Sequence, residues 1–239
     1  MYTKLLLIAH LFSSYANLPH LIVVGSDLKQ MKPSMIVASS PKNQQTTSKG
    51  SLQDMLLALG VRETGIQSGA KQYMFENPEL GFLGKYQFAE VLLIRLGYYQ
   101  ANVYYGNGSK KNYWQGRWTG KNGIDSKVKF LNSPEVQEKA IREAFAVYWQ
   151  DINNILKTQG KSINEYLDRK KTFDDKGKSK TITITISGIL AGAHLRGPDK
   201  VVQLLTSGKV SYDEFGTSIL EYVQEFGGYE STLKDFSSL

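Results

Sequence analysis

The segment Ser51–Glu63, SLQDMLLALGVRE, has the apolar spacing of an amphipathic helix and ends on a carboxylate. At 3.6 residues per turn, one face of this helix carries Leu52, Met55, Leu56, Leu59 and Glu63. Ser51, followed three residues later by Asp54, is an approximate capping arrangement, so we expect the helix to begin here. Glu63 therefore continues the apolar face of the predicted helix.

A carboxyl group on that face would be desolvated, which disfavours its ionised form and raises its pKa. Such a group suits a general acid near neutral pH. The alternative is that the helix frays at Gly60 and that Glu63 is a solvated terminal residue, paired with Arg62 or with a lysine. The spacing alone leaves both interpretations open.

The composition predicts one folded domain with a substantial core, because the chain has 239 residues, of which 41% are hydrophobic and 21% are charged. It contains no cysteine, which excludes disulfides, thiolate metal sites and a cysteine nucleophile. With three histidines, any metal site would need carboxylates. The net charge of +7 would attract nucleic acid, an anionic membrane or an acidic wall polymer.

The amino terminus predicts export. Residues 1–16, MYTKLLLIAHLFSSYA, combine a lysine, a short apolar stretch and small residues, which is typical of a signal peptide, with cleavage possible as late as about residue 25. The apolar run is shorter than the roughly 20 residues of a membrane-spanning helix. Residues 17–50 are predicted to be a flexible linker, residues 51–230 the folded domain and residues 231–239 a tail.

The folded domain is predicted to be mainly α-helical. Beyond the first helix, the sequence predicts helices within residues 85–99 and 133–160, the second with Ser133 as its cap, and from about Ile184 to Leu195. Small glycine and alanine side chains in the last of these would let another element approach closely. The charged stretch DRKKTFDDKGKSK, residues 168–180, is predicted to be a solvated loop.

Two further stretches carry candidate binding groups. GFLGKYQFAE, residues 81–90, places Gly84, Tyr86 and Gln87 at a turn where the backbone can approach a ligand. AGAHLRGPDKV, residues 191–201, places His194 at the end of the small-residue helix. Taken singly, Gly84 is an ordinary turn residue, Gln87 is a surface amide and His194 is a core histidine with its hydrogen bonds made.

The order of these motifs resembles the lysozyme-like superfamily, in particular the bacterial soluble lytic transglycosylases. Glu63-Thr64-Gly65 is similar to the glutamate at a helix end, Gly84 to Gln87 to the G-L-M-Q turn, and Ala193 to Gly197 to the A-Y-N-A-G helix. His194 stands where that family has tyrosine. The resemblance implies a lysozyme-like helical domain with a catalytic cleft, following the signal peptide and linker, with Glu63 as the catalytic residue and Gly84, Tyr86, Gln87 and His194 as substrate-binding residues.

The resemblance also implies cleavage of the β-1,4 bond between N-acetylmuramic acid and N-acetylglucosamine in peptidoglycan, with no metal or cofactor. A two-acid hydrolase would need a second carboxylate near Glu63, and the candidates are Glu76, Glu79, Glu90 and Asp125. None has a motif to support it, which favours a lytic transglycosylase working with Glu63 alone. A muramidase-type hydrolase and a catalytically inactive peptidoglycan-binding module are the alternatives.

Aromatic residues gather in the glycine-rich, basic stretch NVYYGNGSKKNYWQGRWTG, residues 102–120. Sugar faces stack on such rings, so Trp114 and Trp118 are candidate walls of a glycan groove, and Tyr222 and Tyr229 are weaker ones. The alternative is that these rings close the core under a long loop. The expected partners are glycan strands in the periplasm or outside the cell, without nucleic acid and without stable membrane insertion once the signal peptide is cleaved.

Overall fold

The structure is a computed structural model that describes residues 48–102, 112–213, 215–232 and 234–237. The predicted signal peptide and most of the predicted linker lie outside these residues, as do Tyr104 and Tyr105. The fold is mainly helical, as predicted, with two small antiparallel sheets. Its helices are α1 (Leu52–Thr64), α2 (Ala70–Tyr73), α3 (Glu90–Arg95), α4 (Lys127–Leu131), α5 (Pro134–Thr158), α6 (Ile186–Arg196), α7 (Pro198–Ser207), α8 (Ile219–Glu225) and α9 (Lys234–Ser237). Its strands are β1 (Tyr99–Ala101), β2 (Gly116–Trp118), β3 (Lys170–Asp175) and β4 (Lys178–Thr183), and short 3-10 turns cover Lys121–Gly123 and Ile163–Glu165.

The first helix, α1, forms as the sequence predicts. The Ser51 hydroxyl accepts a hydrogen bond from Asp54 N at 3.2 Å, and the Asp54 carboxylate accepts one from Ser51 N at 2.8 Å, which is a reciprocal capping box. Gly65, with φ of 66°, ends the helix in the left-handed region. The predicted apolar face is buried, and Glu63 is buried with it.

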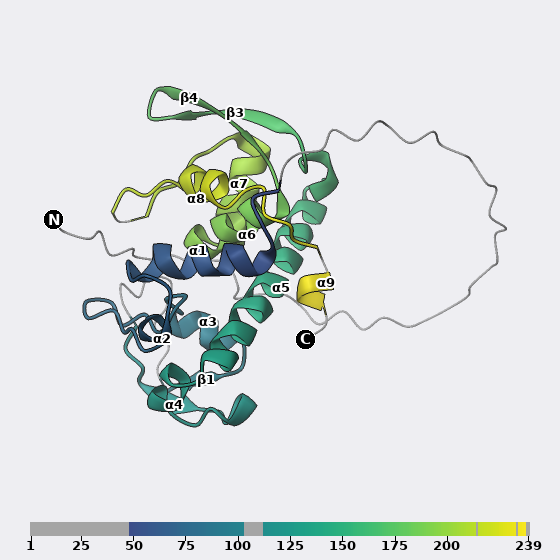
Figure 1. Ribbon diagram of the computed structural model, residues 1–239. Coiled ribbons are helices and arrows are strands. Elements are labelled where there is room, and N and C mark those ends of the chain that lie inside the picture. Colours follow the sequence, from purple (N-terminus) through teal and green to yellow (C-terminus); the bar gives the residue numbers. More distant parts are fainter. Residues whose placement is uncertain (1–47, 103–111, 214, 233, 238–239) are drawn as a thin grey trace, which may run out of the picture.

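The long helix α5 connects the two halves of the molecule. In Figure 1 it runs beside α2, α3 and α4 at one end and beside α6 and α7 at the other, while α1 crosses between them. Its apolar residues recur at spacings of three and four, and this stripe is buried from Val136 to Ile152, with Ile155 partly exposed. Ser133 was predicted to cap this helix, but its hydroxyl does not do so. It donates instead to Lys129 O of the preceding helix, at 2.7 Å.

The charged stretch before α6 is a β-hairpin, so the prediction of a solvated loop was wrong. Lys176 and Gly177, with φ of 56° and 78°, form a two-residue turn between β3 and β4. Phe173 and Ile182 are buried on one face of the hairpin, while most of the charged side chains point to solvent. High charge concealed an alternating pattern that has few apolar positions.

The small-residue helix α6 is central in the fold, beside α7 and α8 (Figure 1). It spans Ile186–Arg196, close to the predicted range, and the Thr185 hydroxyl caps it. A Cβ at Gly188 would lie 2.5 Å from Val223 O, and one at Gly192 would lie 2.9 Å from Val223 Cγ2. The sequence predicts that small residues here let another element approach closely, and that element is α8.

The helix predicted within residues 85–99 is shorter than expected. Only Glu90–Arg95 is helical, because residues 83–88 form a turn in which Leu83 and Phe88 exchange backbone hydrogen bonds of 3.1 and 2.8 Å. Gly84 and Gln87 have positive φ values, of 73° and 47°, which helices do not accommodate.

Both ends of the described domain are attached to it. Lys49 N donates to Gly228 O, and Glu230 N donates to Gly50 O, so the last residues of the predicted linker pair with the segment after α8. In the predicted tail, Phe236 is buried against Phe145 of α5, with ring centroids 6.0 Å apart. The packed unit therefore includes α9.

Candidate active site

Glu63 lies in the last turn of α1 with 1% of its surface exposed. Burial raises the pKa of its carboxyl group to about 8, because the charged form loses its hydration. A hydrogen bond from Tyr222 and the charge of Arg62 oppose this increase, whereas the charges of Asp213 and Glu225 add to it. Glu63 is therefore mostly protonated at neutral pH.

The two carboxyl oxygens of Glu63 have different surroundings. The Tyr222 hydroxyl, on α8, donates to Oε1 at 3.1 Å. Oε2 is buried and has no hydrogen-bond partner among the described residues. Since Oε1 already accepts a hydrogen bond, the proton is best placed on Oε2, where it is free to be donated to another molecule.

His194 lies beside this carboxyl group. Its Nε2 is 3.8 Å from Glu63 Oε1 and 3.0 Å from the backbone carbonyl of Tyr86. Burial lowers the pKa of His194 to about 4, so the ring is neutral at pH 7 and the contact with the protonated Glu63 is not an ion pair. The carbonyl requires a donor, which assigns the proton to Nε2 and leaves Nδ1 as a buried acceptor without a partner in the described structure.

The turn containing Gly84, Tyr86 and Gln87 is anchored to α5. The Tyr86 side chain is buried, and its hydroxyl donates to Glu138 at 2.6 Å, so only its backbone carbonyl faces His194. The Tyr86 side chain is therefore not placed to contact a substrate directly.

Gly84 and Gln87 also have internal partners. A Cβ on Gly84 would lie 2.1 Å from Gln137 Oε1, so a glycine is required for the turn to pack on α5. Gln87 Nε2 donates to Gly84 O at 2.8 Å, while its Oε1 is buried without a partner in the described regions. The turn thus positions the carbonyl that orients His194.

Tyr148 of α5 is a further group at this site that the sequence did not single out. Its ring centroid is 6.4 Å from that of His194, and its buried hydroxyl has no partner within the described chain. Burial and the nearby charge of Glu63 raise its pKa above the ordinary value for tyrosine. The Tyr148 hydroxyl, His194 Nδ1 and Glu63 Oε2 are thus three buried polar atoms without a partner in the described chain, on side chains that neighbour one another in turn. Such clusters are uncommon in packed interiors and indicate a place for water or a ligand.

The rings predicted to form an aromatic wall pack against one another. Trp114 and Trp118 stack with centroids 5.8 Å apart and an interplanar angle of 8°, and Tyr99 packs edge-on against both. Trp114 Nε1 donates to Gly81 O at 2.6 Å, which ties the pair to the segment that leads into the Gly84 turn. Trp118 belongs to β2 and Trp114 precedes that strand, and both rings are partly buried against the core.

The four candidate second carboxylates are engaged elsewhere or exposed. Glu76 pairs with Lys127 and Asp125 pairs with Lys129, at 2.7 and 2.6 Å. Glu90 accepts hydrogen bonds from two backbone amides of the segment before β2, and Glu79 is exposed.

Asp213 and Glu225 are the carboxylates whose charges raise the pKa of Glu63, and Asp213 has the larger effect. Its Oδ1 accepts from the backbone amides of Phe215 and Thr217, at 3.0 and 2.6 Å, while its Oδ2 is buried and lacks a partner in the described chain. In the sequence it belongs to an ordinary turn signal, SYDEFG, and nothing there connects it with a glutamate far away in the chain.

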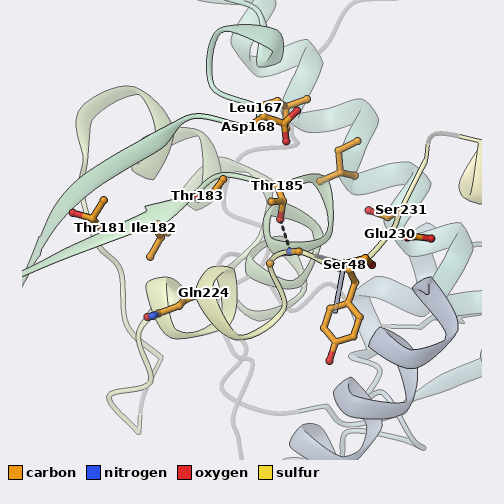
Figure 2. Close-up of a pocket in the computed structure, with 14 residues that line it drawn as sticks. Ser48, Leu167, Asp168, Thr181, Ile182, Thr183, Thr185, Gln224, Glu230 and Ser231 are labelled. Atoms are coloured by element: carbon orange, nitrogen blue, oxygen red, sulfur yellow. Dashed lines mark hydrogen bonds between the residues drawn. The ribbon is translucent and has the colours of Figure 1, made fainter. Parts of the chain in front are cut away.

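A pocket of about 880 Å³ opens on another face of α8. Figure 2 shows it between β4, the start of α6 and the segment after α8, where Gly228 N donates to the Thr185 hydroxyl at 3.2 Å. Gln224 lines this pocket, whereas Tyr222, which bonds to Glu63, lies two residues earlier and points to the other side of the helix. Tyr229, a weaker candidate from the sequence, lines the pocket and not the Glu63 site.

The described residues contain no group of three or more histidine, aspartate or glutamate side chains arranged for a metal ion. None of the helices in the same residues has both the length and the apolar character needed to cross a membrane. Comparisons of the chain with family models, with curated proteins and with solved structures found no significant match.

Proposed function

We propose that the protein cleaves the β-1,4 bond between N-acetylmuramic acid and N-acetylglucosamine in peptidoglycan, as a lytic transglycosylase with a lysozyme-like catalytic domain. The observation that carries this proposal is the state of Glu63, a buried carboxyl group whose pKa is raised to about 8 and whose Oε2 has no partner among the described residues. A carboxylic acid kept protonated near neutral pH is the group that glycosidic bond cleavage requires.

In the proposed reaction, Oε2 of Glu63 donates its proton to the glycosidic oxygen as the bond to the sugar carbon breaks. Positive charge develops on the muramyl ring. The Glu63 carboxylate then removes the proton from a hydroxyl of the same muramyl unit, whose oxygen bonds to the ring carbon and gives an anhydro product. The Tyr222 hydroxyl, 3.1 Å from Oε1, stabilises the carboxylate between the two steps.

Asp213 favours the hydrolase as the second candidate. Its Oδ2 is an acceptor without a partner in the described regions, and its charge already affects the pKa of Glu63. In a two-acid hydrolase it would activate a water or stabilise the charged ring. The product would then carry a reducing end instead of an anhydro end.

The near-complete burial of Glu63 favours the third candidate, an inactive module that binds peptidoglycan. At 1% exposure, the carboxyl group meets a glycan only after neighbouring side chains move. If these side chains do not move, the protein can bind the glycan but cannot cleave it. Activity on purified walls separates this candidate from the two enzymes.

The proposed setting follows from the proposed substrate. The chain is exported through its N-terminal signal segment and acts on glycan strands in the periplasm or outside the cell. Its net charge of +7 would favour association with an acidic wall polymer. Neither a metal nor a cofactor takes part in the proposed steps.

The test is digestion of purified sacculi with the full chain, followed by mass spectrometry of the released muropeptides. Anhydro ends support the transglycosylase, and reducing ends support the hydrolase. Glu63→Gln should abolish release, whereas Glu79→Gln, which removes an exposed glutamate, should not change it. Muropeptide release that survives in Glu63→Gln would refute the role of Glu63. If the unmodified chain releases no muropeptides, the inactive binding module is the candidate that remains.

A further inference from the structure

Strand β4 has an open edge on the side that faces away from β3. Ile184, directly after β4, uses both of its backbone groups on the β3 side, because its N–H donates to Arg169 O at 3.0 Å and its carbonyl accepts from Asp168 N at 2.8 Å. Successive residues of an antiparallel strand direct these groups to alternate edges, so those of Thr181 and Thr183 point away from β3. No other segment of the described chain forms a backbone hydrogen bond with either threonine. Their N–H and carbonyl groups are therefore available to a further strand.

This open edge borders the pocket beside α8. Residues 181–183 of β4 line the pocket of about 880 Å³, whereas none of the residues described for β3 does, so the pocket lies on the open side of the hairpin. Residues 227–231, after α8, line another side of it (Figure 2). The volume is in the range of pockets that hold ligands. The free peptide groups of β4 are thus placed where a ligand can reach them.

The charge of this pocket is opposite to that of the whole chain, which carries +7. Asp168 and Glu230 are the two charged residues that line it, and neither forms an ion pair or a side-chain hydrogen bond within the described chain. A neighbouring cation, Lys49, is engaged elsewhere, since its Nζ donates to the carbonyls of Gln224 and Glu225 at 3.2 and 3.0 Å. The pocket therefore favours a cationic group on its ligand.

We propose that this pocket binds an extended peptide segment of a protein partner, which pairs with the open edge of β4 and places a lysine amine beside Asp168 or Glu230. Strand addition of this kind uses the backbone for affinity and the side-chain surroundings for specificity. A glycan has no peptide groups to match the N–H and carbonyl groups along β4. The proposal goes beyond peptidoglycan cleavage and does not rest on it.

The test is fluorescence anisotropy of a labelled octapeptide, in which threonine and lysine alternate, with the full chain. Two derivatives keep every side chain but carry N-methyl groups on either the lysine or the threonine amides, so each blocks one edge of the peptide. One derivative should bind like the parent, and the other should bind roughly tenfold or more weakly. Replacing the lysines with glutamine should weaken binding by roughly three- to tenfold, as the loss of two partly exposed ion pairs would.

Variants of the protein test the same two contacts. Thr183→Pro removes an outward N–H from β4 and should weaken binding, whereas Thr172→Pro, the matched control, removes an outward N–H from the far edge of β3 and should not. Asp168→Asn combined with Glu230→Gln should reduce the affinity for the lysine peptide to that for the glutamine peptide. Glu79→Gln, an exposed glutamate that does not line the pocket, should leave it unchanged. If Thr183→Pro does not fold, the methylated peptides carry the test of the edge.

Equal binding of the parent and both methylated peptides, or no binding of the parent, would overturn the proposal. So would an affinity for lysine that survives the loss of both carboxylates. If a free peptide of residues 26–47 binds and the octapeptide does not, the pocket belongs to the chain's own N-terminal segment and the proposal fails. It fails equally if an N-acetylglucosamine oligosaccharide displaces the octapeptide. Digestion of sacculi is measured separately, so the proposed cleavage stands or falls without this result.

Discussion

The raised pKa of Glu63 makes the stability of the protein depend on pH in a defined direction. The carboxyl group ionises near its ordinary value of 4.5 in the unfolded chain and near 8 in the folded protein. Below the lower value both states are protonated, and the group contributes no pH dependence. Between the two values unfolding releases a proton, so stability falls as pH rises, by about 1.4 kcal/mol per pH unit.

The perturbation is Glu63→Gln, which removes the titrating group and keeps its shape. Between pH 5 and pH 8, we expect the unmodified protein to lose roughly 3 to 4 kcal/mol of unfolding free energy relative to this variant. The assay is urea denaturation of both proteins at pH 5, 6, 7 and 8. Any fixed cost of the new amide cancels in this difference, as do the titrations of other groups.

The control is Glu79→Gln, which removes a carboxyl group that is exposed to solvent. Its stability should run parallel to that of the unmodified protein at all four pH values. A Glu63→Gln curve that also runs parallel would mean that Glu63 ionises as an ordinary glutamate. That result would refute the argument that burial keeps the acid protonated.

Three further predictions concern the surroundings of the site. The pKa of His194 is about 4 in the folded protein, so the unfolded chain takes up a proton first as pH falls. Between pH 7 and pH 4 the unmodified protein should therefore lose about 3 kcal/mol of unfolding free energy relative to His194→Gln, as measured by urea denaturation. Tyr222→Phe removes a hydrogen bond that lowers the pKa of the proposed acid, so the alkaline limb of the pH–rate profile should move upward; an unchanged limb would contradict the contact. Gly84→Ala should destabilise the protein by roughly 2 kcal/mol more than Gly120→Ala in thermal unfolding, because both have positive φ but only the first would crowd an amide oxygen on α5, at 2.1 Å. Equal losses would show that the turn can shift.

The sequence predicted those elements that depend on residues close together in the chain. The capping box of α1, the buried stripe of α5 and the glycines of α6 depend on residues three to five positions apart, and each is present. The hairpin of β3 and β4 was missed because its turn residues are Lys176 and Gly177, within a run of charge that suggested a loop. The helix beginning at residue 85 was overextended because the pattern did not reveal a positive φ at Gln87.

The sequence by itself determined that Glu63 ends an apolar helical face. Only the tertiary structure decided what surrounds the carboxyl group. The Tyr222 hydroxyl comes from a residue 159 positions away, and no local pattern connects Tyr148 or Asp213 with Glu63. Desolvation depends on every element that packs around a group, so the protonation of Glu63 is not encoded in a short stretch of chain.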